Sequence, residues 1–229
     1  MTEPGTSTSR DRAAWPRIVP FAVFIALLMA EPWLAEPLAA VLDERWLYAI
    51  RSAVTAVFLV ALWGHYVELR RTPATGVAGW AAGVAVGVGV FVLWIALDFP
   101  PLVMGEGDPF DPRVDGRIHP GFALTRLAGA ALVVPVMEEI FWRSFLMRWL
   151  EKPSFLEVDP RQVGPKALLI TSAVFAAEHR LWFAGLLAGL LYGELYRRTG
   201  DIRVVVLSHA VTNGLLGVYV LATGSWTFW

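Results

Sequence analysis

Long runs of apolar residues, separated by short polar joints, follow one another along the chain. A helix that crosses a bilayer needs about 20 mostly apolar residues. Runs close to this length cover residues 18–35, 46–67, 74–97, 121–147 and 202–222, and two shorter runs cover 165–179 and 181–198. The pattern predicts an all-α, polytopic transmembrane helical bundle of about seven membrane segments.

Basic residues are distributed unevenly over the joints. If all seven segments cross and the N-terminus is cytoplasmic, the inner side holds twelve Lys and Arg residues, and the outer side holds only Arg45, Arg113, Arg117 and Arg180. Cytoplasmic loops are enriched in Lys and Arg, so we expect an N-inside, C-outside topology. A cleaved signal peptide is the competing interpretation of the first run.

The chain divides into two parts on this interpretation. Residues 1–14 are small and polar, and we expect a disordered cytoplasmic tail there. Residues 15–229 would form a single integral membrane domain, with the motif-bearing core at 121–222. Small residues at four-residue spacing, Gly185, Gly189 and Gly193 in one run and Gly83 and Gly87 in another, predict faces of close helix packing.

Composition supports a membrane protein and excludes other classes. The chain is 56% hydrophobic with a mean hydropathy of +0.55, and it contains 11 Trp residues, which favour membrane interfaces. Its net charge of -1 gives no basic face for nucleic acid. It has no Cys, which excludes disulfides, thiolate metal sites and a Cys nucleophile. We expect a multi-pass protein of the cell membrane, in contact with membrane lipids.

Two adjacent carboxylates interrupt the apolar run at 121–147. Glu139 and Arg143 have the i,i+4 spacing, with the acid first, that favours an ion pair. Glu138 projects about 100° away from Glu139 on a helix, so it needs a partner on another helix, or water. Charge inside a bilayer costs about 2.5–3.5 kcal/mol on insertion scales and therefore marks functional sites.

Other apolar runs also bring polar groups into the membrane: His179 in "FAAEH", and His209 with Asn213 in "HAVTN". Each alone would be interpreted as a hydrogen-bonding residue that holds helices together. A carboxylate and two imidazoles together can also activate water: the carboxylate acts as base, one imidazole shares the proton, and the other donates to oxyanion charge.

The three motifs resemble, in this order, those of the CAAX protease and bacteriocin-processing (CPBP) family of intramembrane glutamic proteases. "EEIFWR" matches E-E-x-x-x-R, "FAAEH" matches F-x-x-x-H, and "HAVTN" matches H-x-x-x-N. The flanking "VVPVMEEIFWRSFLMRWL" is similar to a bacterial subgroup of CAAX prenyl protease-related proteins linked with exosortase systems.

The resemblance implies an endopeptidase that needs no cofactor. By motif position, Glu138 would be the catalytic glutamate and would activate water with His179, while His209 and Asn213 would stabilise the oxyanion. Glu139 and Arg143 would form a supporting ion pair. The substrate would be a peptide or protein, with C-terminal processing as one form of the activity.

Two alternatives stay open. Glu138, His179 and His209 could bind Zn²⁺ in a metalloprotease, which has three protein ligands and an open position. The chain could also be a non-enzymatic carrier or immunity protein. In the predicted topology His179 lies too far out to meet Glu138, unless the hairpin 165–198 stops short of the outer surface. We expect a cavity that opens to the cytoplasmic side.

Overall fold

The computed structural model describes residues 6–70, 75–105 and 109–229, and its regular structure is nearly all helical. The first hairpin joins α1 (Thr6–Leu38) to α2 (Arg45–Ala61). After short turns η1 (Trp63–His65) and α3 (Val67–Arg70) comes α4 (Val77–Ala96). The C-terminal helices are α8 (Pro165–Ala177), α9 (Trp182–Thr199) and α10 (Ile202–Thr223), and single 3₁₀ turns lie at Phe155–Glu157, Pro160–Gln162 and Trp226–Phe228.

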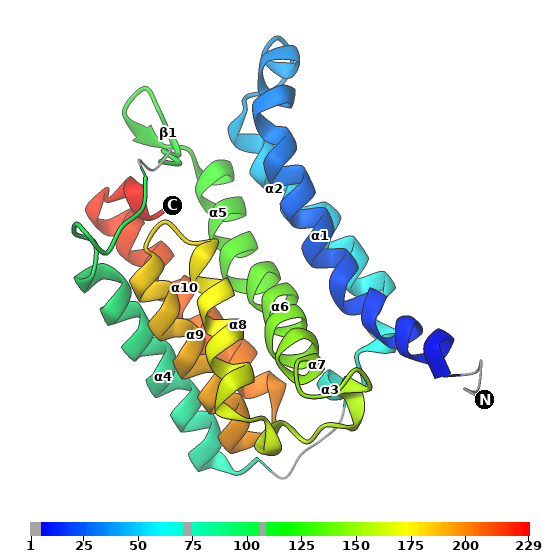
Figure 1. Cartoon of the computed structure of the whole chain (residues 1–229). Coiled ribbons are helices and arrows are strands. Elements are labelled where there is room, and N and C mark those ends of the chain that lie inside the picture. Colours follow the sequence, from blue (N-terminus) through cyan, green and yellow to red (C-terminus); the bar gives the residue numbers. More distant parts are fainter. Residues whose placement is uncertain (1–5, 71–74, 106–108) are drawn as a thin grey trace.

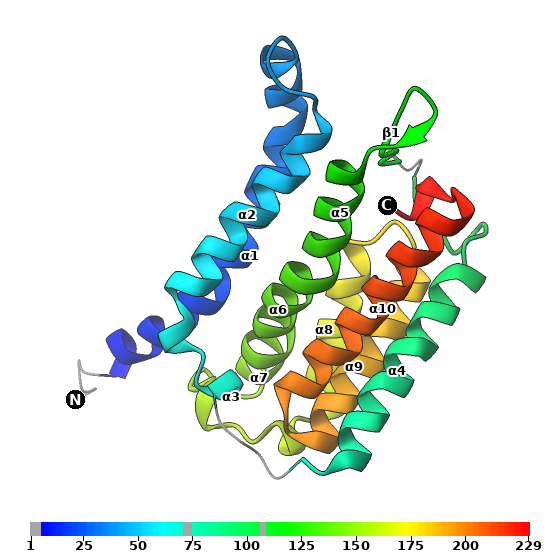
Figure 2. The same cartoon turned by 180° about the vertical axis from the view of Figure 1, so that it is seen from behind.

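One long rod runs through the middle of the molecule. It consists of α5 (Pro120–Ala128), the π-helical turn η2 (Gly129–Val133), α6 (Val134–Glu139), the π-helical turn η3 (Ile140–Leu146) and α7 (Met147–Trp149). The rod lies between the α1–α2 hairpin and the group formed by α4, α8, α9 and α10 (Figures 1 and 2). Both views also place residue 229 and the start of α1 at opposite ends of the bundle.

The expected apolar runs correspond to helices, so the all-α expectation is confirmed. Among the described residues, four helical stretches are long and apolar enough to cross a membrane: Arg12–Leu38, Val77–Ala96, Pro120–Trp149 and Ile202–Thr223. The 13 residues of α8 extend only about 20 Å, less than the roughly 30 Å of a bilayer core. The number of crossings therefore stays a prediction.

Two local features differ from expectation. Helix α1 already begins at Thr6, inside the stretch expected to be a disordered tail, of which residues 1–5 lie outside the described residues. Arg and Ala are strong helix formers, and a helix that is already nucleated extends easily through them.

The joint before α5 contains an antiparallel hairpin of β1 (Arg113–Val114) and β2 (Arg117–Ile118). Its turn is Asp115-Gly116, with positive φ at both residues, and such a pair favours a two-residue hairpin.

The glycine faces make the close contacts that their spacing predicts. On α9, Gly189 faces Ser172 of α8, where an added Cβ would lie 2.9 Å from the Ser172 Cα. On α4, an added Cβ at Gly87 would collide with the backbone oxygen of Ser208 on α10. These contacts hold α8 against α9 and α4 against α10, which fixes the α8–α9 loop that carries His179 and the helix that carries His209.

A buried ion pair ties the N-terminal helix to the rest of the bundle. Arg17 of α1 contacts Glu68 of α3 at 2.6 Å, and Ser144 of η3 donates a hydrogen bond to the same carboxylate. Burial raises the pKa of Glu68, but Arg17 and Ser144 together lower it more, so the pKa lies below the ordinary 4.5. This connection positions α1 beside the segment that carries the two adjacent glutamates.

Candidate active site

The two adjacent glutamates end α6, between two π-helical turns of the rod. A π turn contains one residue more than an α turn, which rotates the side chains that follow it, and such turns occur frequently at functional sites. Pro135 lies at the start of α6, where its missing N–H is least costly. Both Glu138 and Glu139 are buried, with 8% and 0% of their surface exposed.

Glu139 is the centre of a buried network. Its Oε1 accepts a hydrogen bond from Arg143 Nη1 at 3.0 Å, which is the expected i,i+4 ion pair. The same oxygen accepts a second hydrogen bond, from His209 Nδ1 at 2.8 Å. Because a carboxylate only accepts, the hydrogen of this bond belongs to His209 Nδ1. Glu139 thus orients an imidazole as well as neutralising Arg143, a contact that the sequence pattern did not reveal.

Aromatic rings surround this network. The Arg143 guanidinium lies 4.5 Å from the ring centre of Phe175, and the His209 ring stacks on Tyr192 with 5.0 Å between centroids. The Tyr192 hydroxyl bonds Thr212 at 2.6 Å, and Thr212 in turn donates to the Gly87 carbonyl of α4 at 2.8 Å. The His209 side chain is therefore held by its hydrogen bond to Glu139 and by its stacking on Tyr192.

Glu138, unlike Glu139, lies in a cavity wall and has no ion pair with Arg143, although both carboxylates have a buried Oε2 without a hydrogen-bond partner among the described residues. Its Oε2 is buried and has no hydrogen-bond partner among the described residues. His209 Nε2 lies 4.0 Å from this oxygen, a distance that is too long for a hydrogen bond. Such a gap leaves room for a bridging water.

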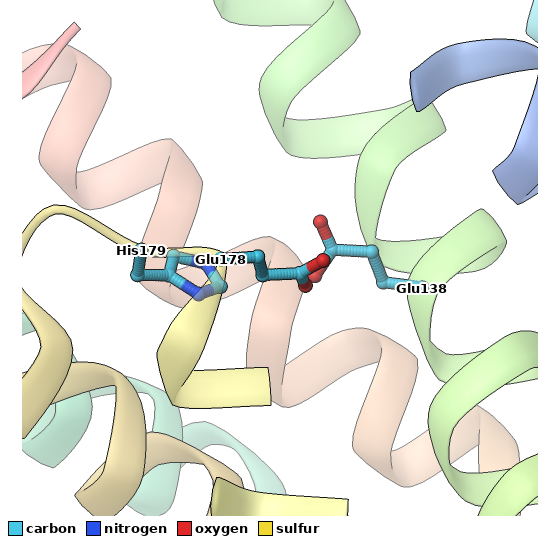
Figure 3. Close-up of side chains that lie close together, drawn as sticks. All are labelled: Glu138, Glu178 and His179. Atoms are coloured by element: carbon cyan, nitrogen blue, oxygen red, sulfur yellow. The ribbon is translucent and has the colours of Figure 1, made fainter. Parts of the chain in front are cut away.

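His179 reaches Glu138 from the loop between α8 and α9, together with its neighbour Glu178. One ligand-type atom from each of Glu138, Glu178 and His179 lies within 4.8 Å of the others. Figure 3 shows the Glu138 and Glu178 carboxyl groups turned toward each other, with the His179 ring beside them. The His179 Nδ1 contacts the Phe175 carbonyl at 2.7 Å, so this nitrogen carries the hydrogen and Nε2 is left as an acceptor. Glu178 was missed in the sequence, although it stands within "FAAEH".

Asn213 lies one turn beyond His209 and also faces the rod. Its Nδ2 donates a hydrogen bond to the Ala130 carbonyl of η2 at 2.8 Å. One amide hydrogen is therefore used to join α10 to the rod, and the second stays available. The structure thus brings Glu138, His179, His209 and Asn213 to the wall of one cavity of about 340 Å³.

The cavity extends beyond the four candidate residues. Its wall also includes Trp94 of α4 and, after α10, Phe228 and Trp229. In Figure 2 the C-terminal end of α10 lies at the end of the bundle that carries the β1–β2 hairpin. In an N-inside, C-outside orientation that end is the outer one. Because the orientation of the bundle is itself a prediction, the expected cytoplasmic opening of the cavity stays a prediction too.

Comparison with known families gives one match. Residues 120–215 match the family described as Rce1-like, type II CAAX prenyl endopeptidase Rce1-like. The matched stretch includes the whole rod, α8, α9 and most of α10, and therefore every candidate site residue, while α1, α2 and α4 lie outside it. The chain matches no curated protein and no solved structure.

Proposed function

We propose that the protein is an intramembrane endopeptidase of the CAAX-protease-like (CPBP) type with Glu138 as its base, and the match of residues 120–215 to the Rce1-like family supports this proposal. The observation that carries the proposal is the buried, unpartnered Oε2 of Glu138, which lies in a cavity wall with two imidazoles. A buried carboxylate oxygen without a partner is costly, and a reactive water is the partner that hydrolysis requires.

The cleavage step follows from this arrangement. Glu138 takes a proton from the water, whose oxygen forms a bond with the scissile carbonyl carbon, and the carbonyl electron pair moves to oxygen. When the tetrahedral intermediate collapses, the C–N bond breaks and the proton passes from Glu138 to the leaving nitrogen. His179 orients the water through Nε2, because its Nδ1 is held by Phe175.

His209 and Asn213 stabilise the oxyanion in this proposal. The second amide hydrogen of Asn213 is free to donate, as its first is bound to Ala130. Because its Nδ1 already donates to Glu139, His209 would donate to the oxyanion from Nε2, with a hydrogen on both ring nitrogens.

A metalloprotease is the second candidate, but with a different ligand set from the one first considered. The described residues that lie within ligand distance of one another are Glu138, Glu178 and His179, and His209 is not among them. Two carboxylates and an imidazole are suitable ligands for Zn²⁺. Chelator treatment of the purified protein separates the candidates: activity that survives it and is unchanged by added Zn²⁺ supports the glutamate mechanism.

The membrane placement that we propose is seven crossings in the cell membrane, with the N-terminus inside. Reporter fusions after Arg161 and after Trp229 should then report the inner and the outer compartment, and one at Asp108, which lies outside the described residues, the outer one. A cytoplasmic signal at Trp229 would show that α8 and α9 do not both cross.

Comparison of protein termini in cells tests the proposed activity and finds substrates. Cells with the wild-type chain should contain new C-termini that are absent from cells with Glu138→Ala. Glu194→Ala, on the exposed end of α9, is the matched control and should retain them. If wild-type and Glu138→Ala cells share every terminus while both proteins are present in the membrane, the chain is not the peptidase proposed.

A further inference from the structure

The loop that carries His179 is short and contains no helical residue. It consists of residues 178–181, between α8 and α9. Figure 3 shows the Glu178 carboxyl and the His179 ring of this loop beside Glu138. A catalytic side chain on a loop depends on the scaffold that positions the loop, so the contacts of residues 178–181 with the rest of the chain set the place of His179.

Arg180, the next residue, joins this loop to two other parts of the chain. Its Nη2 forms an ion pair with Asp98 Oδ1 at 3.2 Å and donates a hydrogen bond to the Thr227 carbonyl at 3.4 Å. Asp98 follows α4, which ends at Ala96, and Thr227 lies in the 3₁₀ turn after α10. One guanidinium therefore connects the α8–α9 loop with the segments that follow α4 and α10.

The joint that follows α4 also bonds to the backbone of the loop and to the start of α9. The Met104 N–H donates a hydrogen bond to the Arg180 carbonyl at 2.8 Å, and the Trp182 indole N–H donates one to the Pro101 carbonyl at 3.1 Å. Arg180 thus holds this joint with its side chain and with its backbone. The side chains of Arg180 and Asp98 are only 25% and 27% exposed, so solvent screens their ion pair less than it screens a surface pair.

Helix α4 contacts the His179 ring directly as well. The Trp94 ring lies edge-to-face to it, with 5.3 Å between the centroids and 83° between the planes, an arrangement that aromatic rings prefer. Phe175 of α8 bonds His179 Nδ1 and so fixes the tautomer, while α4 restrains the ring from a different part of the chain. Helix α4 and its joint lie outside residues 120–215, so the family match gives them no role.

We propose that Asp98 and Arg180 are positioning residues, whose ion pair fixes the α8–α9 loop and so keeps His179 Nε2 within reach of the catalytic water. The inference rests on the proposed function, since it takes His179 to orient that water. Neither residue of the ion pair touches the reacting atoms. Because a misplacement of about 1 Å can reduce a rate about 100-fold, an ion pair outside the site can still control the reaction.

Steady-state kinetics of purified variants test this role, with a substrate found by comparison of protein termini. Asp98→Asn and Arg180→Gln should each lower kcat by about 10- to 100-fold with little change in KM, because the loop positions the water and not the substrate. Arg180→Lys should recover part of the loss, since it keeps the charge. The double variant should be no slower than the slower single variant, because both changes remove one interaction.

Arg113→Gln is the matched control. Arg113 also pairs with an aspartate in the joint after α4, at 2.5 Å, and its described side-chain contacts are with Asp111 and the Trp226 ring rather than with the α8–α9 loop. The control should therefore keep the wild-type kcat. Wild-type kcat in Arg180→Gln, additive losses in the double variant, or an equal loss in Arg113→Gln would overturn the proposal. If Arg180→Gln does not fold, Asp98→Asn tests the proposal by the same kcat criterion.

A measurement without substrate separates failure of this proposal from failure of the proposed function. The chain has no Cys, so His179→Cys gives a single thiol, and its rate of reaction with N-ethylmaleimide reports how often the loop opens. If His179→Cys does not fold, Glu178→Cys in the same loop takes its place. Adding Arg180→Gln should raise the labelling rate roughly 5-fold, which corresponds to the upper contribution of an ion pair near the surface, and adding Arg113→Gln should leave it unchanged.

The labelling rate and the cleavage assay together give distinct outcomes. An unchanged labelling rate with Arg180→Gln would overturn the positioning role, whatever the chain cleaves. If Arg180→Gln raises the labelling rate but the wild type cleaves no substrate, the positioning of the loop is supported and the proposed function fails.

Discussion

Replacing Glu139 by Gln isolates the electrostatic role of the buried network. The substitution keeps the shape of the side chain but removes the charge that neutralises Arg143, which is only 3% exposed. Breaking a buried ion pair from one side typically costs about 3–5 kcal/mol, because it leaves an uncompensated charge. The amide oxygen of Gln can still accept the hydrogen bond from His209 Nδ1, so the loss of charge dominates the effect. We therefore expect Glu139→Gln to lower the free energy of unfolding by about 3–5 kcal/mol.

The measurement is unfolding of the purified protein in mixed micelles with an increasing fraction of SDS. Glu194→Gln is the matched control, because Glu194 also has an i,i+4 Arg partner, Arg198, but its side chain is 36% exposed, and a pair near the surface contributes about 0–1 kcal/mol. Glu139→Gln combined with Arg143→Gln should be less destabilised than Glu139→Gln alone. If the free energy of unfolding of Glu139→Gln falls by an amount within about 1 kcal/mol of that of the Glu194→Gln control, the reasoning is refuted.

Three further predictions follow from other contacts. Asn213→Ala should reduce kcat by about 10²–10³ with little change in KM, as expected for an oxyanion donor; a loss of thermal stability with unchanged turnover of the folded fraction would make Asn213 a packing residue. Gly87→Ala should destabilise the protein by about 1–3 kcal/mol, because a Cβ there collides with α10, whereas Gly89→Ala on the same helix meets open space and should not. Glu68, whose folded pKa lies below 4.5, should contribute stability above that pH and lose it as the pH falls through the folded pKa, so Glu68→Gln should flatten the acid limb of the stability curve.

The helices were predictable because apolar length and turn residues specify them locally. The run at 202–222 became α10, Ile202–Thr223, and the run at 165–179 became α8, Pro165–Ala177. The glycine faces were predictable for the same reason, since four-residue spacing defines a helix face. The hairpin at Asp115-Gly116 could also be predicted locally, because Asp-Gly favours a two-residue turn. The pattern of apolar runs does not take turn residues into account.

The candidate site residues could be named from the sequence, but the contacts between them could not. The i,i+4 pair of Glu139 and Arg143 could be read from spacing, whereas the bond from His209 to Glu139 joins residues 70 positions apart and depends on how α10 packs against the rod. Glu178 was not predicted as a site residue, because the F-x-x-x-H motif assigns a role only to His179.

The central claim is that Glu138 performs the chemistry and Glu139 supports it. Glu138→Gln tests it most directly, since the substitution removes only the charge of a carboxylate whose Oε2 has no partner among the described residues. Purified Glu138→Gln should unfold at the same SDS fraction as the wild type, within about 1 kcal/mol, and should show no cleavage of a substrate found by terminal comparison. Cleavage by well-folded Glu138→Gln at the wild-type rate would contradict the account.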